Sequence, residues 1–147
     1  MMEARRMPVL LVEDDTMVRL TLADFLDEAG LQLQEADSAG QALAILRNPA
    51  QPVDVLVTDL DLGGGDNGLA LAQQAKQLLP KLQVIYATGS PHILEGHSLA
   101  TWEKVFIKPF NPSALVAMVA AMEEQQHPWR LVQPQILSAG MTEASSL

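Results

Sequence analysis

Four short, largely apolar segments of this chain each end at a polar or charged residue. Apolar runs of this length without strict alternation are typical of parallel strands that are covered on both faces. The carboxyl ends of such strands lie at one edge of the sheet, where ligands bind. We therefore expect an acidic pair, a further aspartate, a hydroxyl and a lysine to meet at one site. The segments are residues 9–12, 55–58, 84–87 and 105–107, followed by Glu13-Asp14, Asp59, Thr88 and Lys108.

Length and charge limit the classes of protein to which the chain can belong. Its 147 residues are enough for one domain with a single core. Nine Lys and Arg residues against eighteen Asp and Glu residues give a net charge of -9. Because nucleic-acid affinity depends largely on basic side chains that neutralise phosphates, this balance argues against DNA or RNA as the direct partner. There is no cysteine, which excludes disulfides and thiolate chemistry.

The sequence predicts neither a signal peptide nor a membrane segment. The apolar run after Met7 is too short for the core of a signal peptide, and no run approaches membrane-spanning length. We therefore expect a cytoplasmic protein without a membrane partner. Residues 1–7 are interpreted as an N-terminal extension, residues 8–126 as the domain and residues 127–147 as a C-terminal tail.

Helical spacing of apolar residues recurs between the predicted strands. Residues 16–29 carry one apolar face, and Gly30 is placed to end that helix in a left-handed conformation. Asp15 or Thr16 can cap its start. Residues 31–35 alternate as an edge strand does. The expected inward residues of the first helix are Val18, Leu22, Phe25, Leu26 and Ala29.

Three more helices are predicted from their ends. Ser38 and Gln41 form a capping box ahead of the second helix, which Asn48-Pro49 ends. A Gly-rich loop at residues 63–68 precedes the third, and Asn111-Pro112 opens the last. The expected inward residues are Leu69, Ala72, Ala75, Leu78 and Leu79 in the third helix, and Leu115, Val116, Val119 and Met122 in the last.

The connection between the fourth and fifth strands has the weakest helical pattern. Ser90-Pro91 can begin a helix, but Gly96 interrupts it, so we expect a short or irregular one. The order of elements still predicts five βα units. Right-handed crossovers then place helices on both faces of a five-stranded parallel sheet, an α/β doubly wound sandwich.

The residues at the strand ends also carry a family resemblance. It lies in residues 11–15 (LVEDD), 57–59 (VTD), 87–89 (ATG) and 107–110 (IKPF). In this order they resemble the receiver domain of two-component response regulators, including the single-domain chemotaxis regulators. The resemblance spans roughly residues 8–125 and implies a flavodoxin-like (βα)5 fold.

The same resemblance implies a function in phosphorelay signalling. A stand-alone receiver accepts a phosphoryl group on an aspartate, here Asp59, from a histidine kinase or phosphotransfer protein. It then acts on a downstream protein effector through contacts. Such a protein is a switch rather than an enzyme, with self-phosphorylation and self-dephosphorylation as its only reactions.

The side chains suit this chemistry on independent grounds. Asp59 is a carboxylate nucleophile, and its attack on a phosphohistidine would leave an acyl phosphate. Three carboxylates that crowd together repel one another, so a cation is needed to keep them ionised. Mg²⁺ suits oxygen-only ligands and keeps waters that a phosphate can replace. The resemblance implies that Asp14 and Asp59 bind Mg²⁺ directly, Glu13 through water, and the main-chain carbonyl of Asp61 as a further ligand.

The resemblance also assigns roles to Lys108 and Thr88. Lys108 would pair first with Asp59 and then with a phosphoryl oxygen. Thr88 would donate a hydrogen bond to the phosphoryl group, and its movement would shift the loop that follows. The Lys108-Pro109 bond resembles one that is commonly cis in the family.

The sequence departs from the family pattern in two places. Val105 stands where the family usually has an aromatic switch residue, and Phe106 lies on the opposite side of the strand. The loop after Asp59 has Gly63 where relatives commonly have Pro, and one residue more before the closing Gly68. We expect this loop to be more mobile than usual.

Two other functions stay open. Asp59-Leu60-Asp61 resembles the nucleophile and acid of haloacid-dehalogenase phosphatases, but in that family the nucleophile strand comes first and the metal-binding acids come late. A receiver-like module that never carries phosphate could act by dimerisation alone, and a homodimer is open in either case. His92, His97 and His127 are interpreted as solvated loop residues, because no pair has the spacing of metal ligands on one helix.

Overall fold

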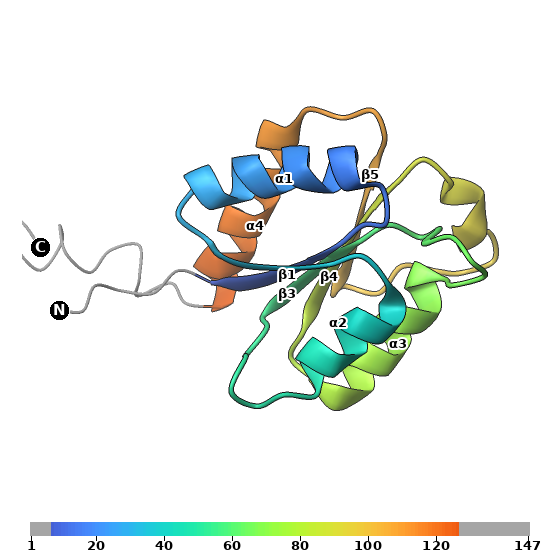
Figure 1. Ribbon diagram of the computed structural model, residues 1–147, viewed down its shortest axis with the longest axis horizontal. Helices are drawn as coiled ribbons and strands as arrows, with labels where there is room; N and C mark the ends of the chain where they lie inside the picture. The colour runs from blue at the N-terminus through green and yellow to red at the C-terminus, as the bar shows by residue number, and fades with distance from the viewer. Residues whose placement is uncertain (1–6, 127–147) are drawn as a thin grey trace, which may run out of the picture.

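The computed structural model describes residues 7–126, which form one sheet flanked by helices (Figure 1). The sheet consists of β1 (Pro8–Val12), β2 (Gln32–Ala36), β3 (Val55–Thr58), β4 (Gln83–Thr88) and β5 (Glu103–Ile107). The α-helices are α1 (Thr16–Glu28), α2 (Ala39–Leu46), α3 (Gly68–Leu78) and α4 (Pro112–Gln126), and a single 3-10 helix covers Pro91–Leu94.

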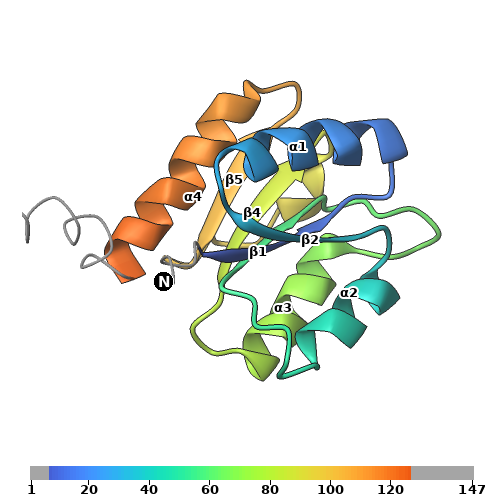
Figure 2. The ribbon, with the colours of Figure 1, turned by 60° about the vertical axis from the view of Figure 1, so that its left-hand side comes forward.

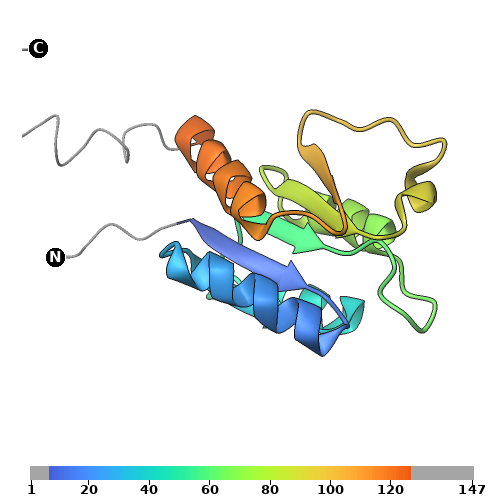
Figure 3. The ribbon, with the colours of Figure 1, turned by 90° about the horizontal axis from the view of Figure 1, so that it is seen from above.

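The five strands are parallel and lie in the order β2-β1-β3-β4-β5. Strands β1 and β3 point the same way in Figure 3, and the loops that follow them lie at that end of the molecule. Val12 is level with Ala36 on one side and with Thr58 on the other, so the next residues of these strands emerge side by side. The predicted doubly wound, flavodoxin-like fold is confirmed.

Two helices cover each face of the sheet. Helices α1 and α4 lie on one face and α2 and α3 on the other (Figures 1 and 2). Alternate residues of the central strands enter the two resulting cores, because successive side chains of a strand point to opposite faces. Leu10, Leu56, Val84 and Tyr86 pack on the α2–α3 side, while Val9, Leu11, Val55, Val57 and Ile85 pack on the α1–α4 side.

The helix ends follow the predicted capping chemistry. Asp15 caps α1 by accepting a hydrogen bond from the Val18 N–H, and Gly30 follows the helix with a φ of 83°. Ser38 caps α2 by accepting from the Gln41 N–H, and the Gln41 side chain accepts from the Asp37 N–H rather than from that of Ser38. The capping box is therefore present with its second bond shifted by one residue.

The prediction that Phe25 and Leu78 face inward is wrong. Phe25 of α1 and Leu78 of α3 are 39% and 41% exposed. Both lie at the border of their apolar stripes, because each stripe is centred on other residues of its helix. In α1 the buried side chains are those of Leu22, Ala23 and Leu26, and in α3 Leu71 is buried with Ala72 and Ala75.

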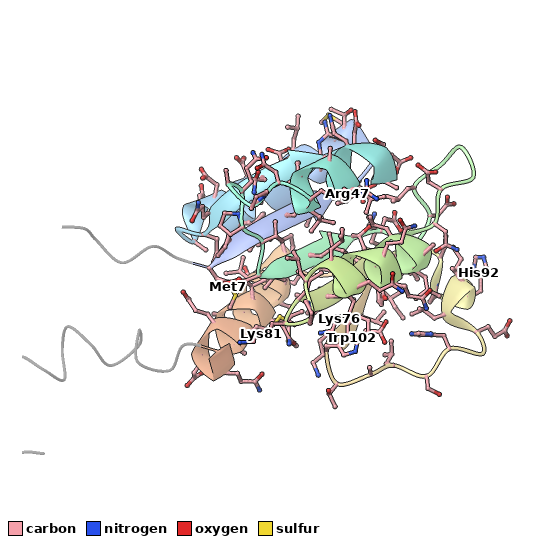
Figure 4. The ribbon with its side chains drawn as sticks, turned by 90° about the horizontal axis from the view of Figure 1, so that it is seen from below. Met7, Arg47, Lys76, Lys81, His92 and Trp102 are labelled. Carbon is pink, nitrogen blue, oxygen red and sulfur yellow. The ribbon has the colours of Figure 1, made fainter. Side chains whose placement is uncertain are left out.

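The connection between β4 and β5 contains a short 3-10 helix, where the weak pattern predicts a short or irregular helix. Only Pro91–Leu94 is helical, and Gly96 adopts a φ of 82°. Trp102 packs against the core on the α2–α3 side, and the Lys76 ammonium of α3 lies 4.7 Å from the centre of its ring (Figure 4). Lys76 also donates to the Leu82 carbonyl at 2.8 Å. This cation–π pair links α3 to Trp102, the residue directly before β5.

Within residues 7–126, none of the helices is long and apolar enough to cross a membrane. The predicted tail at 127–147 lies outside the described residues, and the domain limits stay a prediction. Met7, assigned from the sequence to the N-terminal extension, is fully buried against the core on the α1–α4 side.

Gly68, the first residue of α3, lies against the end of β3. Its N–H donates to the Leu60 carbonyl at 2.7 Å, and a Cβ built at this position would overlap the Asp59 carbonyl oxygen. That oxygen belongs to the backbone and cannot rotate away. Only glycine therefore lets α3 start this close to Asp59.

We predict that Gly68→Ala lowers the free energy of unfolding by about 1–3 kcal/mol, because the helix must move away from Asp59. Gly40→Ala in α2 is the matched control, since its Cβ would meet no atom within 4 Å. That change is expected to stabilise the protein by up to about 1 kcal/mol. Urea denaturation of both variants measures the difference, and equal stabilities would contradict this account of Gly68.

Candidate functional site

Three acidic side chains converge at the carboxyl edge of the sheet. Glu13 and Asp14 follow β1, and Asp59 follows β3 on the neighbouring strand. One carboxylate oxygen of each lies within 4.8 Å of the others. Glu13 is 2% exposed and Asp59 is 9% exposed, while Asp14 faces solvent. The acids that the sequence predicts to meet are therefore brought together here.

Lys108, which follows β5, reaches two of these acids. Its ammonium donates to Oε1 of Glu13 at 2.5 Å and to Oδ2 of Asp59 at 3.1 Å. Burial by itself would lower the pKa of Lys108, but the hydrogen bond and charge of Glu13, helped by Asp59, outweigh burial and raise it. The lysine is thus held charged between two carboxylates. The peptide bond that follows, Lys108-Pro109, is cis.

Glu13 is the most enclosed of the acids. Burial raises its pKa, and the hydrogen bonds from Lys108 and from the Asp15 N–H offset this only in part. The Asp15 N–H donates to Oε2 at 3.1 Å, and Arg19 of α1 donates to the Glu13 carbonyl at 2.9 Å. These contacts fix the strand end and the carboxylate relative to α1.

Asp61 lies in the loop beyond Asp59. Its N–H donates to Oδ1 of Asp59 at 3.2 Å, and its own carboxylate accepts from the Gly63 N–H at 3.1 Å. Gly63 has a φ of 76°, and a Cβ there would lie 2.9 Å from Oδ2 of Asp14. The glycine at this position therefore lets the loop pass close to Asp14.

Thr88 ends β4 beside the acids, but its hydroxyl is turned to its own loop. The side chain is fully buried, and Oγ1 accepts from the Ser90 N–H at 2.9 Å. The Thr88 carbonyl accepts from the Lys108 N–H at 2.8 Å, which ties the ends of β4 and β5 together. Thr88 is thus placed next to Lys108, with Gly89 and Ser90 nearer the open side of the site.

These residues surround an open hollow of about 460 Å³. Apart from the ammonium of Lys108, its charged groups are carboxylates, and oxygen ligands of this kind fit a hard divalent cation such as Mg²⁺. The nearly buried Asp59 lines this hollow, and like Glu13 it accepts hydrogen bonds from Lys108 and from a main-chain N–H. The hollow is lined by Glu13, Asp14, Asp15, Val18, Asp59, Asp61, Gly63, Gly89, Ser90 and Lys108.

An apolar groove adjoins this hollow, and the sequence did not reveal it. It has a volume of about 340 Å³ and lies between the start of α1 and the residues from Lys108 to Pro112. Met17 on its rim is 72% exposed. Sequence reasoning also missed the close packing of Gly63 and Gly68 on the acids, although both belong to the Gly-rich loop that it singled out.

Comparisons with known proteins agree with the fold. Residues 9–120 match the response regulator receiver domain. The response regulator receiver protein CpdR of Brucella abortus is 32% identical over 116 residues, which cover 78% of this chain and 94% of CpdR. The transcriptional regulator NtrC of Salmonella typhimurium is 35% identical over 127 residues, but the chain spans only about a quarter (26%) of its length.

Solved structures show the same fold. A CheY-like receiver domain protein from Methanospirillum hungatei has a TM-score of 0.72 at 24% identity, over 84% of this chain and 98% of that one. A receiver protein from Sinorhizobium medicae also gives 0.72, at 21% identity, over 80% and 94% of the two chains. Because the family match covers most of its residues, the chain belongs to the response regulator receiver domain family.

Proposed function

We propose that this receiver accepts a phosphoryl group on Asp59 from the phosphohistidine of a kinase or phosphotransfer protein. The observation that carries the proposal is the contact of Asp59 with Lys108 inside a cluster of carboxylates. A lone aspartate at a strand end would be an ordinary turn residue. One that is nearly buried, paired with a lysine and flanked by two acids is suited to receive and neutralise a phosphoryl group.

In the transfer, a carboxylate oxygen of Asp59 attacks the phosphorus of the phosphohistidine. The phosphorus–nitrogen bond breaks, the imidazole leaves with its electron pair and takes up a proton, and an acyl phosphate forms. Because such transition states are loose, catalysis depends mostly on positioning and charge neutralisation. Lys108, already within 3.1 Å of Oδ2, can move from the carboxylate to a phosphoryl oxygen.

The acids of the site fit a magnesium ion. Glu13, Asp14 and Asp59 offer oxygens within 4.8 Å of one another, and the Asp61 carbonyl belongs to the loop that lines the same hollow. A Mg²⁺ ion held there supplies positive charge for the carboxylates and the incoming phosphoryl oxygens. Glu13 and Asp14 would then bind the Mg²⁺ ion and would not act as nucleophiles.

The donor is a protein that docks beside the acids. The apolar groove next to Lys108 and the exposed Met17 and Leu20 of α1 give such a partner a surface at the rim of the hollow. A histidine on the docked protein would then face Asp59. Kinases of this type use ATP, which is a cytoplasmic substrate, so a receiver that they phosphorylate would work in the cytoplasm.

The phosphoryl group would be sensed by Thr88. Its hydroxyl oxygen now accepts from the Ser90 N–H, and a phosphoryl oxygen would accept a hydrogen bond from the proton of that hydroxyl. A turn of Thr88 toward the site breaks the bond to Ser90 and frees the loop that begins at Gly89. The downstream partner is then a protein that distinguishes the two loop positions, so the chain acts as a switch and not as an enzyme.

Lys108→Ala should lower the free energy of unfolding by about 1–3 kcal/mol in magnesium-free buffer, because it leaves the charges of Glu13 and Asp59 without their partner. Lys104→Ala on the same strand is the control, since Lys104 is exposed. Urea denaturation with and without Mg²⁺ measures both. Added Mg²⁺ should restore more stability to Lys108→Ala than to the control. Equal effects in the two variants would count against the charge cluster.

Asp59→Asn should abolish labelling by a small phosphoryl donor. Incubation of the wild type with Mg²⁺ and phosphoramidate is expected to add one base-labile acyl phosphate, seen as a mass increase in intact-protein mass spectrometry. Asp37→Asn is the matched control, because Asp37 also follows a strand at this edge but lies outside the cluster. That variant should label as the wild type does.

Labelling, together with an assay of phosphate-monoester hydrolysis, distinguishes the other two functions. Labelling of Asp59→Asn at an equal level would show that the acceptor is elsewhere. Repeated turnover of phosphate monoesters would favour a phosphatase of the haloacid-dehalogenase type. Absence of any labelling by several donors, in a folded protein with Mg²⁺, would favour a receiver-like module that acts by dimerisation alone.

A further inference from the structure

A second polar cluster lies in the interior, away from the acids. Glu103, the first residue of β5, is 2% exposed and accepts three hydrogen bonds. The Tyr86 hydroxyl donates to Oε2 at 2.6 Å, Nε2 of His97 lies 3.0 Å from both oxygens, and the Ala100 N–H donates to Oε1 at 2.8 Å. We call Tyr86, His97 and Glu103 the β4–β5 clasp. His97 is not the solvated loop residue that the sequence suggested.

The clasp lies next to Val105 of β5. Tyr86 of β4 is paired directly with Val105, the position at which the sequence departs from the family's aromatic switch residue. The Tyr86 ring is fully buried, and its burial, with the bond to Glu103, raises the pKa of its hydroxyl far above the usual value. This ring cannot turn outward without breaking the bond to Glu103.

Glu103 stays ionised over the neutral range of pH. Burial alone would raise its pKa, but the hydrogen bonds from the Ala100 N–H, Tyr86 and His97 outweigh burial and lower it. Nε2 of His97 donates a hydrogen bond to Glu103 both in the charged ring and in the neutral tautomer that carries its proton on Nε2. The clasp is therefore closed irrespective of the charge of His97, and it is a mechanical restraint rather than a pH switch.

The clasp divides the connection from Gly89 to Trp102 into two parts. Residues 97–102 are held at His97 and Ala100 by Glu103, and Trp102 is held by the Lys76 ammonium. Residues 89–96 are tied to the site through the Ser90 N–H and the Thr88 hydroxyl. The backbone bonds of Ile93 and Glu95 stay within this part, and one bond crosses to the other part, from the His97 N–H to the Leu94 carbonyl at 2.8 Å. Gly96, with its φ of 82°, stands at the junction.

We propose that Glu103 is a positioning residue that confines the phosphorylation-dependent movement to residues 89–96 and keeps residues 97–102 on the sheet. This inference rests on the proposed function, because the movement begins when Thr88 releases Ser90. The surface that changes is then that of Pro91, His92 and Glu95, all exposed, which a downstream protein would contact. The Trp102 surface stays the same in both states.

Hydrogen–deuterium exchange tests this boundary. The probe is Mg²⁺ with beryllium fluoride, which a solved structure of the response regulator TrrA from Thermotoga maritima contains. In the wild type, exchange in peptides covering 89–96 should change about tenfold or more on addition of the probe, and exchange in 97–102 less than about twofold. In Glu103→Gln and His97→Gln the change should extend through residue 102.

Glu95→Gln is the matched control, an exposed acid of the same connection that is not part of the clasp. It should keep the wild-type boundary. Circular dichroism melting identifies any variant that fails to fold, and His97→Gln, at a partly exposed position, decides the question if Glu103→Gln does fail. Glu103→Asp, which keeps the charge on a shorter stem, should restore the boundary in part.

Two results would overturn the inference. One is equal exchange changes in 89–96 and 97–102 of the wild type, and the other is a wild-type boundary in both His97→Gln and Glu103→Gln. Protection of the peptide that contains Asp59 shows separately whether the probe has bound. If that peptide and the loop are both unchanged, the proposed function fails. If only the loop result differs from expectation, the proposed function stands and the role of Glu103 falls.

Discussion

The repulsion among three carboxylates is the constraint on which this site depends. Glu13, Asp14 and Asp59 lie close enough for their oxygens to share one ligand, and two of them are almost out of contact with water. Unit charges at such distances repel by kilocalories, about 4 kcal/mol at 4 Å for an effective dielectric constant of 20. Lys108 offsets part of this repulsion, and its raised pKa reflects the attraction. The remaining negative charge is the physical basis for the proposed magnesium site.

The fold brings these charges together and holds them at a fixed distance. Parallel strands β1, β3 and β5 place Glu13, Asp59 and Lys108 at one edge of the sheet. Gly63 and Gly68 let the loop after β3 and the start of α3 pass close to the acids. The same edge carries Thr88, whose carbonyl binds the Lys108 N–H and whose hydroxyl holds Ser90. In the proposed function these bonds couple charge at the site to the position of one loop, and the proposed role of the β4–β5 clasp is to set how far along that loop a change can travel.

Much of this could be predicted from the sequence, for a specific physical reason. An apolar run followed by an acid gives both a buried strand and the place where its side chain emerges, so the convergence of Glu13, Asp14, Asp59 and Lys108 followed from the fold class. The contact of Tyr86 with Glu103, which are 17 residues apart, could not be foreseen, because it depends on the register of β4 and β5. Likewise, the apolar spacing of α1 leaves the rotation of the helix about its axis open. Phe25 was predicted to face inward, but in the structure Ala23 is buried and Phe25 is 39% exposed.

Binding of a paramagnetic cation tests the central claim most directly. In ¹⁵N-labelled protein, substoichiometric Mn²⁺ should broaden the amide signals of residues 13–15 and 59–61 first, and excess Mg²⁺ should restore them. The indole N–H of Trp102, on the α2–α3 side, should keep its line width at that stage. Broadening centred instead on the exposed acids Asp24, Asp27 and Glu28 of α1, or spread evenly over the acidic surface, would contradict a single site built from Glu13, Asp14 and Asp59.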